Sequence, residues 1–117
     1  MKYMLMFFAD EAGWMALSEE ERTAAVGRIG AWVGQNAQAG RIIEGHRLAG
    51  NDMATTVRLG APGQPGTASV VDGPFIEAKE AIGSYAIVEV PDLDAAIALA
   101  SGWPGGGAVE IRPVAEG

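Results

Sequence analysis

The sequence contains no cysteine and a single histidine, His46, among its 117 residues. The absence of cysteine excludes disulfides, thiolate metal sites and cysteine nucleophiles together. With one imidazole, only carboxylates remain as further metal ligands, so we expect no bound transition metal, and we expect no cofactor. A chain without cysteine suits a reducing compartment, and we therefore expect a cytoplasmic location.

Basic residues are also scarce. Eight Lys and Arg stand against 15 Asp and Glu, which gives a formal net charge of −7 and leaves no basic stripe for phosphates or anionic lipids. The apolar run from Tyr3 to Ala9 ends at Asp10, far short of the roughly 20 residues of a membrane span. We expect neither nucleic acid nor a membrane as a partner.

The remaining composition is that of a globular protein, with 49% apolar and 20% charged residues. A chain of this length fits one hydrophobic core and can bury about two-thirds of its unfolded surface. We predict one soluble, compact domain over residues 1–117.

Hydrophobic periodicity and turn residues predict alternating strands and helices. The predicted strands are residues 2–9, 41–48, 54–60, 68–71, 81–90 and 108–114, and the predicted helices are residues 18–39 and 92–100. In the second helix the predicted buried residues are Leu93, Ala96, Ile97 and Ala100.

The longer helix has clear signals at both ends. Ser18 and Glu21 form a capping box, and Gly40 supplies a left-handed stop. The predicted buried stripe consists of Val26, Ile29, Val33 and Ala37, with Ala25 and Trp32 beside it. Gly27, Gly30 and Gly34 each cost about 1 kcal/mol relative to alanine, so we interpret them as places where the helix packs closely on a sheet.

The order β-α-β-β-α-β predicts a ferredoxin-like α+β fold, with both helices on one face of an antiparallel sheet and an extra short strand or hairpin before Asp72. Strands 2–9 and 81–90 are apolar on both faces, so the second face needs cover. We predict a homodimer in which a twofold-related copy covers this face, with space for a ligand between the two sheets.

The segment Asp72-Gly73-Pro74-Phe75, followed by Glu77, Lys79 and Glu80 and then Gly83, resembles the DGPF subgroup of the YCII-related proteins. The resemblance extends to residues 2–8, 54–58, 91–96 and 108–114. It implies a dimeric ferredoxin-like α+β barrel, and some members of the subgroup occur beside alternative sigma factors. The broader family carries a His/Asp pair with its His in the first helix. Residues 18–39 contain no histidine, so that pair cannot be transferred to this chain.

Asp72 is a candidate general base, with a turn role as the alternative. An Asp-Gly pair is a strong turn signal, because Asp bonds nearby backbone and Gly accepts a positive φ. Glu77 and Lys79 alternate to the same side of an extended segment, either as a surface ion pair or as a proton-handling pair at a cleft. Glu80 points the other way and is a weaker candidate.

Glu110 and Arg112 share one face of the last strand. They either form a structural bridge, or Arg112 binds an anionic ligand through two N–H groups. His46 is a candidate acid–base residue, although a lone histidine beside Arg47 also suits an exposed strand. The aromatic candidates for ligand stacking are Tyr3, Phe7 and Tyr85, whose alternative role is in the core or an interface.

No P-loop, dinucleotide-binding, GxSxG or HExxH motif is present. We therefore predict small-molecule binding between paired sheets, with cofactor-independent acid–base catalysis as the reaction class that the candidates would support. Two alternatives remain open, a regulatory or accessory module that acts through protein contacts, and a structural dimer without a ligand.

Overall fold

The computed structural model describes residues 1–116. Its elements are β1 (Lys2–Asp10), α1 (Glu11–Ala16), α2 (Glu19–Gln38), β2 (Ile42–Arg47), β3 (Thr55–Arg58), β4 (Ser69–Asp72), β5 (Glu80–Glu89), α3 (Leu93–Ser101) and β6 (Ala108–Pro113). One-turn 3₁₀ helices lie at Asn51–Met53 and Pro65–Thr67. The predicted strands and both long helices are all present. The short helix α1 was not predicted, although Asp10 caps it by accepting from the Ala12 N–H at 3.1 Å.

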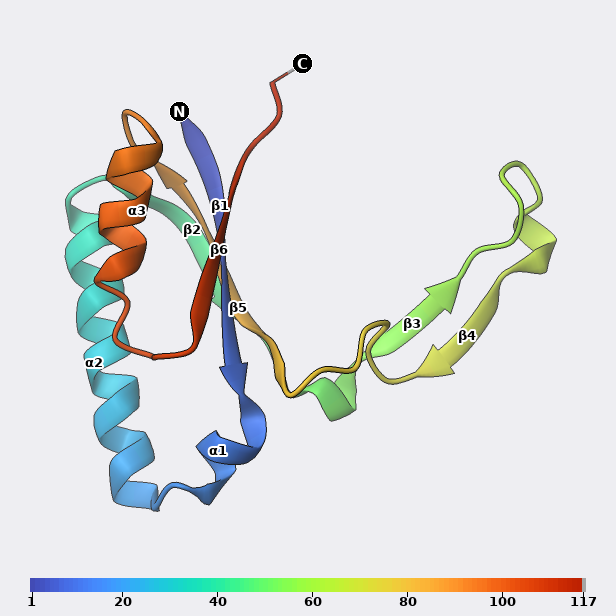
Figure 1. The fold of residues 1–117 in the computed structure, drawn as a ribbon, viewed down its shortest axis with the longest axis horizontal. Coiled ribbons are helices and arrows are strands. Elements are labelled where there is room, and N and C mark those ends of the chain that lie inside the picture. Colours follow the sequence, from blue (N-terminus) through green and yellow to red (C-terminus); the bar gives the residue numbers. More distant parts are fainter. Residues whose placement is uncertain (117) are drawn as a thin grey trace.

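The main sheet has four antiparallel strands in the order β2-β5-β1-β6. Both α2 and α3 lie on one side of it (Figure 1). This order and the one-sided helix layer confirm the predicted ferredoxin-like α+β fold.

The core lies between the sheet and the two helices. Alternate residues of β1, namely Tyr3, Leu5 and Phe7, are buried there together with Ala86 and Val88 of β5. The residues between them point to the opposite side of the sheet, as expected for a strand with a side-chain period of two. We call that opposite side the open face, because α2 and α3 cover only the other one.

The ends of α2 follow the prediction. The Ser18 hydroxyl accepts from the Glu21 N–H at 3.1 Å, and Glu21 accepts from the Ser18 N–H at 2.9 Å. Gly40, just beyond the helix, has φ +76°, a conformation that costs little only for glycine. The capping residues that fix the two ends of α2 lie within or next to the helix, so they could be identified from the sequence.

The buried stripe of α2 differs from the prediction. Ile29 faces inward as predicted, but Val26 and Val33 are 48% and 39% exposed and Ala37 is exposed. The other inward residues are Ala25 and Trp32, which were predicted beside the stripe, and Asn36. Trp32 sets this rotation, because its ring packs at 6.0 Å from Phe7 and 5.2 Å from Trp103 between ring centroids.

In α3 the buried residues are Ala96 and Leu99, whereas Leu93 and Ile97 are exposed. The prediction was therefore right for Ala96 but wrong for Leu93 and Ile97. Alanine at the point of contact lets the helix approach the sheet closely, and the larger side chains lie around its outer surface.

The predicted role of the three helix glycines was also wrong. A Cβ atom built on Gly27, Gly30 or Gly34 meets nothing within 4 Å, so none of them packs closely on the sheet. All three are exposed on α2. Close packing requires a neighbour at contact distance, and these positions have none within the described chain.

The strands β3 and β4 form a separate two-stranded sheet, which extends from the open-face side of the molecule (Figure 1). We call residues 54–73 the arm. The radius of gyration is 16.7 Å, whereas a compact domain of this length has about 13 Å. The predicted hairpin is therefore present, but the prediction of a compact domain was wrong for this segment.

Candidate functional site

The open face of the four-stranded sheet brings together candidate residues that are far apart in the sequence. The strand registers place His46 of β2, Tyr85 of β5, Met6 of β1 and Glu110 of β6 side by side in one row across the sheet. Side chains that are directly opposite in antiparallel strands lie on the same face, with Cβ atoms about 5 Å apart. The sequence separations alone did not reveal this row.

A second row runs parallel to the first, one side-chain step further along the strands. It consists of Glu44, Ile87, Met4 and Arg112. The two rows together give the open face an apolar centre on β1 and β5. Each outer strand carries one acid and one nitrogen base, namely Glu44 and His46 on β2 and Glu110 and Arg112 on β6. We call these eight residues the open-face site.

The β2 margin of the site holds the carboxylate of Glu44 and the imidazole of His46, and we include in it the phenol of Tyr85, which lies beside them on β5. Glu44 Oε2 lies 3.7 Å from His46 Nε2, and the rings of His46 and Tyr85 are 5.7 Å apart between centroids. The His46 side chain is 64% exposed in the single chain. A carboxylate next to an imidazole can orient the ring, and a phenol can donate or accept a hydrogen bond.

The β6 margin holds a tighter ion pair. Arg112 Nε donates to Glu110 Oε2 at 2.7 Å, with both residues on the same strand and the same face. This is the predicted Glu–Arg bridge. A guanidinium has five N–H donors, so the described contact leaves donor capacity for another acceptor.

The centre of the open face is apolar. Its half-buried side chains are Met4, Met6 and Phe8 of β1 and Ile82 and Ile87 of β5. A register shift between Phe7 and Phe8 skips Gly83, so Phe8 pairs with Ile82 and the apolar surface continues as far as this pair. A sheet face in contact with water usually carries polar residues instead.

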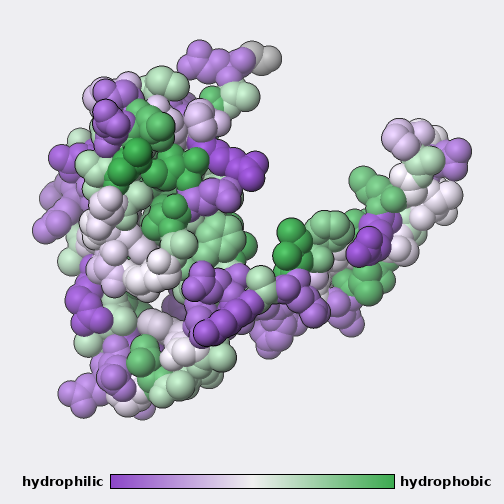
Figure 2. Space-filling view, in the orientation of Figure 1, coloured by the Kyte–Doolittle hydropathy of each residue, from purple (hydrophilic) through white to green (hydrophobic). Residues whose placement is uncertain are grey.

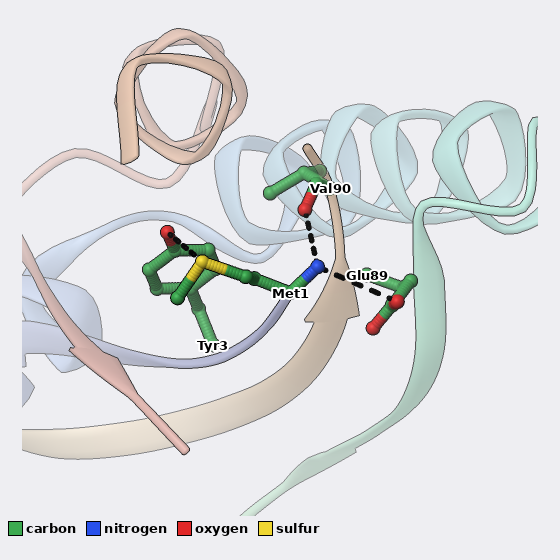
Figure 3. A network of polar contacts seen from close by, with 4 residues as sticks. All are labelled: Met1, Tyr3, Glu89 and Val90. Atoms are coloured by element: carbon green, nitrogen blue, oxygen red, sulfur yellow. Dashed lines mark hydrogen bonds and ion pairs between the residues drawn. The ribbon is translucent and has the colours of Figure 1, made fainter. Parts of the chain in front are cut away.

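Tyr3 and Phe7 are on the other face of the sheet. They are 2% and 4% exposed in the core beneath the helices, and Figure 3 shows the Tyr3 hydroxyl donating to the Met1 sulfur, at 3.6 Å. The Met1 amine in turn donates to the Val90 carbonyl at 2.9 Å. Of the three aromatic candidates, only Tyr85 therefore lies on the open face, and the other two have the alternative core role.

Asp72 lies at the end of β4, in the arm, opposite Thr55. The turn that follows is held by the Gly73 N–H, which donates to the Ala54 carbonyl at 2.8 Å, and by the Thr56 hydroxyl, which donates to the Gly73 carbonyl at 2.7 Å. Gly73 has φ +102°, as the Asp-Gly turn signal predicts. Asp72 is exposed and stands apart from the open-face site of its own chain.

The segment from the arm back to β5 carries Glu77, Lys79 and Glu80, all of which are exposed. Lys79 Nζ lies 3.9 Å from Asp10 Oδ2 at the end of β1, rather than beside Glu77. Among residues 1–116 Glu77 forms no ion pair. These side chains lie at the base of the arm and not between the two margins of the open-face site.

Three further features of the described residues bear on function, namely metal ligands, membrane-spanning helices and shifted pKa values. Within residues 1–116, no three His, Asp or Glu side chains gather closely enough to hold a metal ion. The same residues include no helix with the length and apolarity to cross a membrane. The hydrogen bonds from Ser18 lower the pKa of the Glu21 carboxyl, but this group caps α2 and is not part of the site.

Four members of the open-face site were not candidates from sequence, namely Glu44, Met4, Met6 and Ile87. The signal for them was present in the alternation of strand residues. Glu44 precedes His46 by two positions, so both must share a face of β2. The pairing of β2 with β5 rather than β1, which brings His46 to Tyr85, depends on the strand order and was not visible from spacing.

Comparison with known proteins gives two matches that span almost the whole chain. The sequence model of the YCII-related domain matches residues 1–116. An uncharacterized protein of Rhizobium meliloti (strain 1021) is 30% identical over 119 residues, which cover 98% of this chain and 93% of the relative. Both matches include the four-stranded sheet and the arm, so the chain belongs to the YCII-related family.

Proposed function

We propose that the protein binds a small molecule with an apolar body and a polar group on the open face, and that a second copy of the chain covers this face. The observation that supports the proposal is the pair of cross-strand rows, in which an apolar centre lies between two ionisable margins. A small-molecule site characteristically combines an apolar lining with a few polar groups that fix orientation.

The apolar body of the ligand contacts the centre of the face. Met4 and Met6 are unbranched and polarisable, so they adapt to irregular ligand shapes better than branched side chains do. Ile87 and Phe8 extend the same surface along the strands. Binding removes these half-buried side chains from water, which is the main favourable term for an apolar ligand.

The polar group of the ligand lies at the β2 margin. There His46 and Tyr85 supply hydrogen-bond donors, and Glu44 is close enough to orient the imidazole. If the ligand is a substrate, His46 accepts a proton from it and returns that proton to the product, while Glu44 stabilises the imidazolium. This chemistry uses only side chains of the chain.

The second copy supplies the cover that one chain lacks. The ionisable side chains of the margins are 45–72% exposed in the single chain, where water weakens their interactions with any ligand. Facing sheets whose side chains interdigitate pack about 10 Å apart, so a ligand between the two open faces requires a wider separation over the apolar centre, in a space from which water is excluded. Removal of water strengthens each hydrogen bond at the margins.

The test is a thermal-shift screen with aromatic and medium-chain aliphatic carboxylates, aldehydes and phenols, followed by calorimetric titration of each hit. We expect His46→Gln and Tyr85→Phe to raise the Kd of a hit about tenfold or more, the scale of one lost hydrogen bond to a charged or buried group.

Arg47→Gln is the matched control, because Arg47 follows His46 on β2 and pairs with Ser84 on the other side of the sheet. It should leave the Kd unchanged. A hit that binds the wild type, His46→Gln and Tyr85→Phe with equal Kd would remove the β2 margin from the proposed site.

A further inference from the structure

The arm has almost no support from its own chain. β3 and β4 pair with each other in a sheet separate from the main one, and Figure 1 shows them standing away from the sheet and the helices. An isolated two-stranded hairpin is at best marginally stable in water, because it has no second layer on which to bury its side chains. The arm nevertheless carries hydrophobic residues on its surface (Figure 2).

The two faces of the arm differ. On one face Arg58 lies over the Phe75 ring at 5.1 Å, so the chain partly covers this face with its own residues. On the other face Val57 of β3 lies directly opposite Val70 of β4, and these side chains are 53% and 68% exposed. We call this second side the bare face of the arm, and Asp72 shares it because it pairs with Thr55.

The surface of the whole chain also exceeds that of a compact monomer. The accessible surface is 8071 Å², whereas a folded monomer of 12.1 kDa exposes about 6,000 Å². The excess of roughly 2,000 Å² is more than the ~800 Å² that each partner buries in a standard protein–protein interface. The chain therefore has enough surplus surface for a stable complex.

The shape of the chain fits a second copy as the partner. In Figure 1 the arm and the open face are the two sides of an L, and α2 and α3 lie on the side of the sheet away from the arm. A twofold axis that brings two open faces together places each arm alongside the other copy. At about 3.3 Å per residue the four residues of β3 span about 13 Å, which is more than the ~10 Å spacing of packed sheets.

We propose that the arm is a clasp between two copies of the chain, which packs its bare face, with Val57 and Val70, against the second copy. The clasp rests on the sheet pairing in the proposed function and adds to it, since each open-face site is then enclosed by the arm of the other copy. It also places Asp72 at the contact with the second copy and not in the site of its own chain.

The test is sedimentation velocity of the wild type and of the double variant Val57→Glu/Val70→Glu over a range of protein concentrations. We expect a wild-type dimer and a variant whose dimer Kd is raised at least 100-fold, because four carboxylates enter an apolar contact. Val26→Glu/Val33→Glu is the matched control. Its valines are similarly exposed but lie on α2, behind the sheet, and its Kd should equal that of the wild type.

Circular dichroism and thermal unfolding show whether each variant keeps its fold, which we expect because the arm does not pack on the core. Hydrogen exchange gives a second measurement on the unaltered protein. Amides of residues 55–58 and 69–72 should exchange slowly in the dimer and quickly after dilution below its Kd, because only the second copy protects the arm.

Two outcomes contradict the clasp and separate it from the proposed function. A double variant that dimerises as tightly as the wild type overturns the clasp but leaves the sheet pairing and the open-face site intact. A wild type that stays monomeric at micromolar concentration overturns the clasp and the dimeric cover of the site together.

Discussion

At the scale of single residues, a step of one position along a strand separates core from candidate site. Tyr85 lies on the open face, and its neighbour Ala86 is buried beneath the helices. The same alternation explains why Tyr3 and Phe7 share no surface with Tyr85, although all three are aromatic strand residues. A candidate aromatic residue can therefore be assigned to a face only when its strand's register is known.

Asp72 gives the first prediction. Because the hydrogen bonds that hold its turn come from Gly73 and Thr56, the change Asp72→Asn should alter the free energy of unfolding of the single chain, in which Asp72 is exposed, by no more than about 0.5 kcal/mol. The affinity for hits of the ligand screen should also stay the same. Thermal unfolding and calorimetric titration measure the two quantities.

A loss of activity in Asp72→Asn would contradict the turn role and support a catalytic one. If Asp72 is a general base, Asp72→Asn lowers activity about 10²-fold or more with an unchanged melting temperature. Gly73→Ala is the companion variant that tests the turn itself. At φ +102° a Cβ atom is strained, so this change should destabilise the arm by about 1–2 kcal/mol.

The exposed helix glycines give the second prediction. A Cβ at Gly30 meets nothing within 4 Å, so Gly30→Ala adds no clash and reduces the flexibility of the unfolded chain. We expect the free energy of unfolding to rise by about 0.5–1 kcal/mol, measured by chemical denaturation. Gly102→Ala is the control, since its Cβ would lie 3.2 Å from the Trp32 ring nitrogen, and it should not stabilise. If Gly30→Ala lowered the free energy of unfolding, the prediction that Gly30 packs closely on the sheet would be supported again.

At the scale of elements, the boundaries of α2 could be predicted from the sequence more accurately than the face that it turns toward the sheet. The capping box at Ser18 and Glu21 was correct from sequence because it depends only on residues three positions apart. The inward stripe was correct only at Ile29, because Trp32 turns toward Phe7 and Trp103, which come from distant parts of the chain. Tertiary packing thus decided the helix face, while local chemistry decided the helix boundaries.

The capping box gives the third prediction, which concerns pH. The pKa of Glu21 is lowered from its ordinary 4.5, first by the hydrogen bond from the Ser18 backbone N–H and then by the Ser18 side chain. A carboxyl with a lowered folded-state pKa stabilises the fold above its unfolded-state pKa and loses this contribution as the pH falls through the lower value.

Glu21→Gln keeps the hydrogen-bonding shape but cannot ionise. We therefore expect the wild type to be more stable than Glu21→Gln at pH 7, and the difference to shrink below about pH 4.5. Thermal unfolding at several pH values measures it. Glu20→Gln, on the same first turn, is the control for general charge effects near the helix N-terminus. A difference that stayed constant from pH 7 to pH 3 would contradict the assigned cause.

At the scale of the whole molecule, the sequence was sufficient for the fold class and insufficient for the shape. The order of elements and the alternation in residues 2–9 and 81–90 predicted one sheet with one helix layer. The position of the arm could not be predicted, because residues 55–58 and 69–72 combine β-branched and polar residues as in any short strand. Nothing local distinguishes a strand that joins the sheet from one that leaves it.

The candidate site was predictable only in part for the same reason. His46, Tyr85 and Arg112 were named from their chemistry, but their common face depends on the order β2-β5-β1-β6. Lys79 was expected beside Glu77, yet the end of β1 brings Asp10 to it instead. Spacing along a strand identifies side chains that share a face, whereas contacts between elements require the topology.

The open face itself gives the last prediction, because it links the fold to both proposals. Met4 lies in the centre of this face with Ile87 on one side and Arg112 on the other. In a single chain a glutamate at this position contacts Arg112 and water, so Met4→Glu should leave the four-stranded sheet folded. In a dimer the same carboxylate enters the space between two sheets, where an incompletely paired charge is strongly disfavoured. We expect Met4→Glu to raise the dimer Kd at least 100-fold in sedimentation velocity and to abolish binding of the ligand-screen hits.

Met15→Glu on α1, where the methionine is 70% exposed, is the matched control and should behave as the wild type. A Met4→Glu protein that forms the wild-type dimer with unchanged Kd would show that the two copies meet through another surface, and the ligand site would then have to be complete within one chain.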